Sequence, residues 1–184
     1  MQNAAEVVVV RLGHRPGRDD RMTTHVGLTA RALGADRFVL VADDTGPLDR
    51  IDAVTDRFGG PFETDQADSF GSFCRDWSGM MVHLTMYGLP IQETVDAVRP
   101  AVAPDTTGLA IVVGAEKVPF EVYERADHNI AVTNQPHSEI ASLAVLLDRI
   151  FGNEALERSF VGGTHRVRPQ ACGKLVEPCD DAGP

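Results

Sequence analysis

Residues 108–150 form the segment that most restricts the fold. They contain two patterns of a buried strand, each of which runs into a loop and then into a helix pattern. The first strand pattern ends in the loop 114–119 and the second in the loop 133–139, and both loops are rich in glycine, proline or polar residues. In an open parallel sheet, ligands bind outside the carboxyl ends of strands, next to loops of this kind. The segment therefore predicts a parallel sheet with a ligand pocket between these loops.

The rest of the chain shows the same alternation of strand and helix patterns. A helix is expected after the polar loop 13–21, with Thr23 or Thr24 as its N-cap and Gly34 after its end. Further strand patterns lie at 6–12, 38–42, 62–64 and 80–84, and further helix patterns at 48–58, 70–77, 91–98 and 138–151. This order predicts an α/β fold, with a mostly parallel sheet that helices cover on both faces.

The C-terminal part of the chain has a different character. Residues 160–178 alternate between apolar and polar side chains and contain several glycines, which is typical of an extended arm or a hairpin. Residues 180–184 are expected to be a frayed end. We therefore predict one domain over residues 1–152 and a C-terminal arm over residues 153–184.

The charge of the chain is strongly negative but unevenly distributed. The net charge is −10, and the chain has only two lysines, which is typical of proteins from salt-loving hosts. Two segments are nevertheless basic, and they predict local contact with a polyanion. The first holds Arg11, Arg15, Arg18 and Arg21, and the second, 158–176, lacks acidic residues and holds Arg158, Arg166, Arg168 and Lys174.

Several classes of protein are disfavoured by the sequence. It has no apolar run of the roughly 20 residues that span a bilayer and no basic leader, so we expect a cytoplasmic protein without a membrane segment. The glycine motifs of Rossmann and P-loop nucleotide sites are absent after the first strand. The cysteines Cys74, Cys172 and Cys179 have no metal-ligand spacing. No metal site is expected, because no helical i, i+4 pair and no cysteine or acidic cluster accompanies His14, His25, His83 and His137.

Four segments resemble one known family. They are LGHRPGRDDRMTTHVGLTARALGAD (12–36), VHLTMYG (82–88), IVVGAEKVP (111–119) and NQPHSEIASLAVLLDR (134–149). Together they are similar to the archaeal tRNA cytidine 2'-O-methyltransferases of the knotted SPOUT superfamily, over nearly the whole chain. The resemblance implies a homodimer with a C-terminal trefoil knot. It also implies methyl transfer from S-adenosylmethionine to the ribose 2'-hydroxyl of the cytidine at tRNA position 56. A knotted tRNA-binding protein without activity, and a SPOUT enzyme that acts on another RNA position, remain as alternatives.

The resemblance also implies where the cofactor binds. Its loops correspond to Leu84, Gly114, Ala115, Glu116, Lys117, Val118, Val132, Thr133, Asn134, Gln135, Pro136, His137, Ser138 and Glu139. The residue types fit, because a glycine lets the main chain approach a ligand closely, and proline is favoured at the first position of a helix, where N–H groups are free.

Methyl transfer to a ribose needs a group that assists the weakly acidic 2'-hydroxyl. Related knotted enzymes use an arginine near the first loop, so Arg15 is our first candidate, with Arg18, Arg21 and Arg31 as alternatives. Because a guanidinium stays protonated, its role is to stabilise the oxyanion or a phosphate. The superfamily's usual N-x-x-x-x-x-R pattern is absent here, and Thr24 stands seven residues before Arg31. Contacts to RNA are expected from Arg18, Arg21, Arg166, Arg168 and Lys174.

Overall fold

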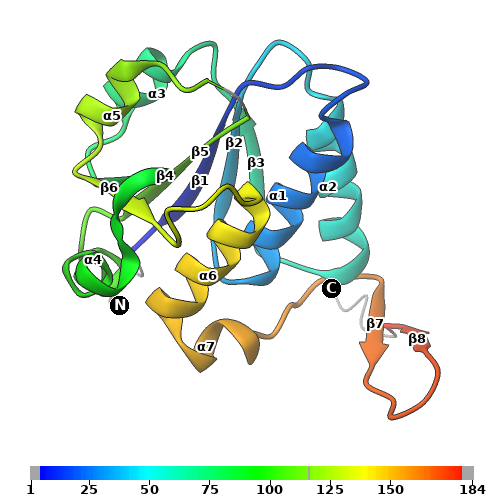
Figure 1. Cartoon of the computed structure of the whole chain (residues 1–184). Coiled ribbons are helices and arrows are strands. Elements are labelled where there is room, and N and C mark those ends of the chain that lie inside the picture. Colours follow the sequence, from blue (N-terminus) through cyan, green and yellow to red (C-terminus); the bar gives the residue numbers. More distant parts are fainter. Residues whose placement is uncertain (1–4, 116, 180–184) are drawn as a thin grey trace.

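The computed structural model describes residues 5–115 and 117–179 and is organised around a six-stranded sheet (Figure 1). The strand order is β3-β2-β1-β5-β4-β6, and every pairing within the sheet is parallel. The central strand β1 is buried on both faces, which explains its run of four valines, Val7–Val10. The strands are β1 Val7–Leu12, β2 Arg37–Val41, β3 Glu63–Gln66, β4 Met80–Pro90, β5 Leu109–Gly114 and β6 His128–Ala131.

Helices cover both faces of this sheet. One hydrophobic core lies between the sheet and α1 Asp20–Ala32, α2 Gly46–Phe58, α4 Ile91–Val98 and α6 Glu139–Phe151. A second, smaller core lies on the opposite face, under α3 Phe70–Asp76 and α5 Phe120–Arg125. The short helices η1 Arg99–Val102 and α7 Asn153–Leu156 follow α4 and α6. The predicted α/β fold with a parallel sheet is therefore confirmed, whereas the knot stays a prediction.

The first helix begins earlier than its sequence pattern indicates. It starts at Asp20, with Asp19 at the N-cap position, so the prediction of a cap at Thr23 or Thr24 was wrong. Thr23 lies inside the helix, fully buried, and its hydroxyl accepts a hydrogen bond from Arg11 Nε at 2.9 Å. The polar side chain therefore serves a contact with the sheet instead of ending the helix.

Strand β4 is longer than the expected 80–84 and is interrupted. Leu84 and Leu89 both stand opposite Ile130 of β6, so residues 85–88 project from the ladder at its carboxyl end. Irregularities of this kind are common next to active sites, because they free main-chain groups and redirect side chains. Gly88 is required there, since an added Cβ would lie 2.5 Å from the backbone of Asn129.

The C-terminal segment forms an antiparallel hairpin of β7 His165–Arg168 and β8 Leu175–Pro178, as expected for an arm or hairpin. Paired backbone hydrogen bonds between Gly60 and Val161, of 2.9 and 3.1 Å, attach it to the end of α2. The apolar side chains of the hairpin are exposed, namely Val167, Leu175 and Val176. No helix in the described part of the chain is long and apolar enough to cross a membrane.

Candidate functional site

Three loops meet at the carboxyl edge of the sheet and enclose a cavity of about 270 Å³. The register explains the convergence, because Leu12 of β1 pairs with Gly114 of β5, and Leu84 of β4 pairs with Val113. The lining residues come from the projecting turn of β4, the loop after β5 and the segment that enters α6. They are Leu84, Thr85, Met86, Gly114, Ala115, Pro136, His137, Glu139 and Ser142. The volume is close to the lower end of small-molecule sites, about 300 Å³.

Asn134 ties two of these loops together. Its side-chain amide donates hydrogen bonds to the main-chain oxygens of Met86, at 2.7 Å, and Gly88, at 3.1 Å. The loop after β6 is thereby fixed against the projecting turn of β4, although the two lie almost fifty residues apart in the chain. Asn134 does not line the cavity itself, so its contribution is to hold the wall in place.

The N-terminal end of α6 forms another wall of the cavity. The Ser138 hydroxyl caps the helix by accepting a hydrogen bond from the Ile140 N–H at 3.2 Å. Glu139 lines the cavity, and its carboxylate is 2.9 Å from Nη1 of Arg11, whose side chain is only 1% exposed. The buried Arg11 therefore neutralises a partly exposed acid, and our assignment of Arg11 to a polyanion-binding surface was wrong.

A second cavity, of about 350 Å³, adjoins the first, and Ala115 lines both. Its lining is mostly apolar, with Phe70 and Val118 among the lining residues. Its charged rim includes Arg15 from the loop after β1 and Lys117 from the loop after β5. A flat, partly polar group that enters the second cavity would lie between the guanidinium of Arg15 and the loop after β5, which also borders the first cavity.

The Arg15 side chain is oriented by Asp19. Nε donates to Oδ2 at 2.9 Å and Nη2 to Oδ1 at 3.1 Å, a bidentate geometry in which the guanidinium plane is fixed. Asp19 is nearly buried, and the hydrogen bond from the Arg15 side chain is the main reason that its pKa is lowered to about 2. The pair is therefore fully ionised at neutral pH.

The other candidate arginines lie in different surroundings. Arg18 and Arg21 are exposed close to Arg15, as an RNA contact requires. Arg31 lies about 16 Å along α1 from the first residue of the helix, Asp20, because each helical residue advances the chain by about 1.5 Å. It is buried, its guanidinium lies 4.4 Å from the Phe160 ring centroid, and burial lowers its pKa. These contacts give Arg31 a structural role at the other end of the helix, so it is no longer a catalytic candidate.

The predicted cofactor residues separate into three groups. Leu84, Gly114, Ala115, Pro136, His137 and Glu139 line the first cavity, whereas Lys117 and Val118 line the second. Val132 packs against the larger core, and Thr133, Gln135 and Ser138 are exposed beside Asn134. Glu116 lies outside the described residues. Thr85, Met86 and Ser142 also line the first cavity but were not among the predicted residues. Ser142 follows Glu139 at i+3, a spacing that places both on one face of a helix.

His83 has a structural environment. Its side chain is buried on β4, with Nδ1 2.9 Å from Oδ1 of Asn129 and its ring edge-on to Tyr123. Burial lowers its pKa, so the ring is neutral at neutral pH. His14 differs, because the structure brings two carboxylates to it, those of Asp20 and Asp44. We had expected no acidic cluster beside the histidines, and spacing along the chain does not reveal this one.

The hairpin that carries the C-terminal basic residues lies at the opposite end of the sheet from the strand-end loops (Figure 1), and those loops line the two cavities. Arg166 lines a groove of about 800 Å³ at the base of the hairpin, together with Arg31, Phe58 and Arg158. Arg168 donates to Glu177 across the hairpin at 2.7 Å, so its charge is partly compensated, whereas Lys174 is exposed in the turn.

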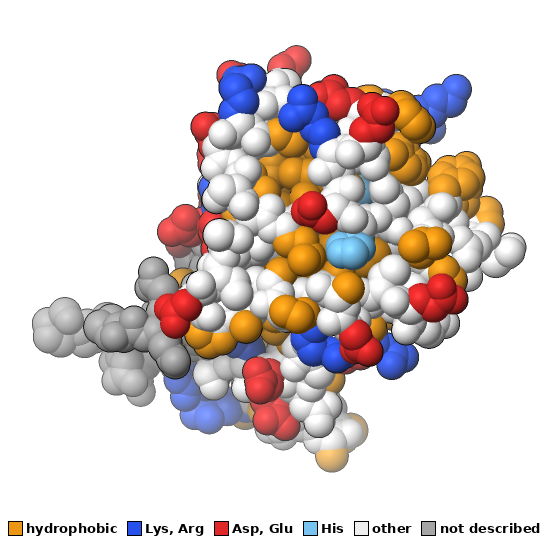
Figure 2. Space-filling view, turned by 90° about the vertical axis from the view of Figure 1, so that its left-hand side faces the viewer, with side chains coloured by type: hydrophobic (Ala, Val, Ile, Leu, Met, Phe, Trp, Pro, Cys, Tyr) orange, Lys and Arg blue, Asp and Glu red, His pale blue; other side chains and the backbone are white. Residues whose placement is uncertain are grey.

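One side of the molecule exposes large apolar side chains. Tyr87, Leu89 and Phe120 are 74%, 62% and 73% exposed. They belong to β4 and α5, and Figure 2 shows apolar side chains gathered on the side of the molecule where these elements lie. Large apolar residues grouped in this way mark an interaction surface more often than a solvated one.

Comparison with known proteins places these features in one family. Residues 58–177 match the model of the family described as "tRNA ribose 2'-O-methyltransferase, aTrm56". A tRNA (cytidine(56)-2'-O)-methyltransferase of Natronomonas pharaonis is 55% identical over 98% of this chain and 99% of its own length. Relatives with the same name from Haloarcula marismortui and Pyrococcus abyssi are 54% and 46% identical, over 98% and 92% of this chain and 99% and 86% of theirs.

Solved structures of lower identity share the fold. A crystal structure of an RNA 2'-O ribose methyltransferase has a TM-score of 0.58 at 15% identity. The match covers 82% of this chain and 57% of the chain in that structure. A crystal structure described as "A. aeolicus TrmH/SpoU tRNA modifying enzyme" has a TM-score of 0.57 at 12% identity, over 85% of this chain and 79% of its own. At these identities the likeness supports the fold alone.

Proposed function

The chain belongs to the tRNA ribose 2'-O-methyltransferase family, and we propose that it methylates the ribose 2'-hydroxyl of cytidine 56 in tRNA, with S-adenosylmethionine as the methyl donor. The curated relatives that match almost the full chain carry this activity in their names. The observation that carries the proposal is the meeting of three strand-to-helix loops in one cavity, next to a second cavity that Arg15 lines.

The first cavity fits the adenosyl part of the donor. Small residues, Gly114 and Ala115, leave room for main-chain groups to contact a ligand, and the N-terminal end of α6 offers N–H donors. The charge of Glu139 is offset by Arg11, so the wall carries no uncompensated acid there. S-adenosylmethionine, when bound, supplies a methyl group on a sulfonium sulfur. Of the predicted set, Val132, Thr133, Asn134, Gln135 and Ser138 then serve to hold the loop in shape.

Arg15 is the proposed catalytic residue. A guanidinium keeps its proton, so Arg15 stabilises the negative charge that develops on the 2'-oxygen and does not act as a base. Asp19 holds the guanidinium plane through two hydrogen bonds, which fixes the position of this charge before the ribose arrives. The hydroxyl proton leaves to solvent water, because a carboxylate with a pKa of about 2, such as Asp19, is a poor acceptor.

The remaining contacts concern tRNA and a second copy of the chain. Arg18 and Arg21 are proposed to hold phosphates near Arg15, and Arg166, Arg168 and Lys174 to hold a more distant part of the tRNA. The resemblance implies a homodimer, and the apolar surface of Tyr87, Leu89 and Phe120 supports it, because this surface needs a cover. A tRNA substrate also supports the cytoplasm as the compartment.

The decisive experiment is a methylation assay with the purified chain, labelled S-adenosylmethionine and an unmodified tRNA transcript. We expect label in a 2'-O-methylcytidine, at position 56 when the tRNA is digested and mapped. A transcript with cytidine 56 replaced by uridine is the matched control and should remain unlabelled. Tight tRNA binding without label would instead support an inactive binding protein, and label at another nucleotide would support a different specificity.

A further inference from the structure

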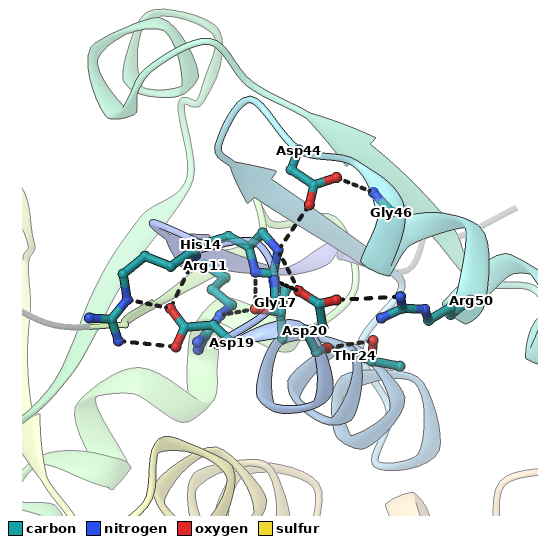
Figure 3. A network of polar contacts seen from close by, with 11 residues as sticks. Arg11, His14, Gly17, Asp19, Asp20, Thr24, Asp44, Gly46 and Arg50 are labelled. Atoms are coloured by element: carbon teal, nitrogen blue, oxygen red, sulfur yellow. Dashed lines mark hydrogen bonds and ion pairs between the residues drawn. The ribbon is translucent and has the colours of Figure 1, made fainter.

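A histidine and two carboxylates converge beside the Arg15 loop (Figure 3). His14 lies in the loop after β1, Asp20 is the first residue of α1, and Asp44 lies in the loop between β2 and α2. Nε2 of His14 is 3.3 Å from Oδ1 of Asp20 and 3.3 Å from Oδ2 of Asp44. The three ligand-type atoms all lie within 4.8 Å of one another. The parallel register brings the loops together, because Leu12 pairs with Val41.

His14 is the part of this cluster that requires an explanation. Its side chain is 0% exposed, yet Nε2 has no hydrogen-bond partner among the described residues. Both carboxylates are at ion-pair distance only, and neither completes a hydrogen bond with Nε2. Buried polar atoms in folded proteins nearly always have a partner, and the exceptions often indicate an ion that is not part of the chain.

The outer contacts orient all three side chains toward the same point. Asp20 Oδ1 accepts a hydrogen bond from the Gly17 N–H at 2.8 Å, and Asp44 Oδ1 accepts one from the Gly46 N–H at 2.9 Å. Nδ1 of His14 is 2.9 Å from the hydroxyl oxygen of Thr23. Metal-binding histidines and carboxylates typically have such supporting hydrogen bonds, which fix their orientation.

Thr23 also bears on the protonation of the ring. Its oxygen accepts a hydrogen bond from Arg11 Nε, and a hydroxyl oxygen has a second lone pair that can accept one from His14 Nδ1–H. In that tautomer Nε2 carries a lone pair directed at the two carboxylates. In the other tautomer Thr23 donates to Nδ1, and an Nε2–H faces the carboxylates instead. The two arrangements make opposite predictions for cation binding.

The distances also agree with a shared cation. A zinc ion lies about 2.0–2.1 Å from nitrogen and oxygen ligands, and tetrahedral geometry then separates the ligand atoms by about 3.3–3.4 Å. Both distances from His14 Nε2 are 3.3 Å. The carboxylates of Asp20 and Asp44 are 33% and 38% exposed, so they can adjust, and water can complete the coordination.

We propose that His14, Asp20 and Asp44 bind a divalent transition-metal cation, for which Zn²⁺ best fits the mixed nitrogen and oxygen ligands. The cation joins three segments that surround the proposed catalytic pair, because His14 precedes Arg15 and Asp20 follows Asp19. It contacts neither Arg15 nor the methyl donor, so it positions the loop. The site stands whether or not the chain methylates RNA.

Binding is tested on the full chain after removal of metals with a chelator and dialysis. Calorimetric titration with ZnCl₂ should show a site that Asp44→Asn weakens at least about tenfold. The substitution retains Oδ1, the acceptor for the Gly46 N–H, so the loop keeps its hydrogen bond. Asp43→Asn is the matched control, because it removes the same charge from the neighbouring position and should bind Zn²⁺ like the unmodified chain. Equal Zn²⁺ affinity in both variants would overturn the proposal.

Thermal unfolding of the metal-free proteins gives a second readout, because the two tautomers of His14 predict changes in Tm of opposite sign for Asp44→Asn. If Nε2 carries a lone pair, Asp44→Asn relieves repulsion between two carboxylates and should raise the Tm of the metal-free chain. Zn²⁺ should then raise the Tm of the unmodified chain above that of the variant. A fall in Tm for metal-free Asp44→Asn, with no response of the unmodified chain to Zn²⁺, would instead identify an imidazole–carboxylate hydrogen bond and sink the proposal.

Discussion

Arg15 and Asp19 show how one turn of chain presents a charge to a pocket. The loop after β1 places them four residues apart, at the position where α1 begins. Asp19 occupies the N-cap position but makes no side-chain cap, because both of its oxygens accept hydrogen bonds from Arg15. Asp19 therefore orients the Arg15 guanidinium instead of capping the helix. Two effects of this contact can be measured.

The first effect concerns catalysis by Arg15. Arg15→Ala should lower kcat for tRNA methylation by about 10²–10³-fold, as the loss of one preorganised donor to an oxyanion does. Arg15→Lys should recover part of this, since it keeps the charge but not the planar fork. Affinity for S-adenosylmethionine should be unchanged in calorimetry. Arg18→Ala is the comparison, and its main effect should be on KM for tRNA. If Arg18→Ala reduced kcat more than Arg15→Ala, the assignment would be reversed.

The second effect concerns the dependence of stability on pH. The pKa of Asp19 is lowered from 3.8 to about 2 in the fold, so its ionisation stabilises the protein above about pH 4, and this contribution disappears as pH falls toward 2. Because Arg15 is 37% exposed, we expect the pair to contribute about 1–2 kcal/mol and not more. Asp19→Asn should lose that amount at pH 7 in urea unfolding, and the difference from the unmodified chain should vanish near pH 2.

Asp96→Asn provides the control for this experiment. Asp96 pairs with Arg99 at 2.6 Å, but its side chain is 83% exposed, so the pair is well solvated. Its removal should change the free energy of unfolding by less than about 0.5 kcal/mol at any pH. A loss in free energy of unfolding as large as that of Asp19→Asn would mean that the bidentate contact with Arg15 stabilises the fold no more than an exposed ion pair does.

At the scale of the elements, local sequence patterns predicted where the loops lie. The projecting turn of β4 and the contact of Asp44 with His14 depend instead on how the strands pair. The turn residues of 114–119 and 133–139 mark strand ends from the sequence alone, and the structure brings both to one cavity. The projecting turn of β4 was not predictable, because it depends on how Leu84 and Leu89 both align with Ile130. Asp44 was missed for the same reason, since only the pairing of β1 with β2 brings it to His14.

The cavity at the carboxyl end of β5 can be tested with one substitution at each end of this strand. Gly114→Trp should fill the space between the loops and abolish S-adenosylmethionine binding, with a loss of affinity above about 100-fold in calorimetry. Thr107→Trp adds the same side chain at an exposed position just before the other end of β5 and should leave affinity unchanged. Equal binding by the two variants, both still folded by circular dichroism, would place the cofactor elsewhere.

At the scale of the whole molecule, charge is the dominant property. The chain has 27 acidic and 17 basic residues and a net charge of −10. At low ionic strength these carboxylates repel one another across a small domain and oppose folding. Ion pairs such as Arg37–Glu6 and Arg158–Asp36 offset a part of this repulsion, but most acidic side chains remain unpaired within the described residues. The matches to proteins of Natronomonas pharaonis and Haloarcula marismortui agree with a host that supplies screening salt.

This charge makes salt the variable that decides stability. The Debye length falls from about 10 Å at 0.1 M to about 3 Å at 1 M, so repulsion between surface carboxylates is largely removed over that range. We expect the free energy of unfolding in urea to rise steeply between about 0.1 M and about 2 M KCl, and the fold to need salt in the molar range. NaCl should act like KCl if screening is the cause, whereas sulfate at equal ionic strength should stabilise further by strengthening burial of apolar surface. Full stability in dilute buffer would show that the acidic surface is tolerated without screening, and the inference of a salt-loving host would lose its physical basis.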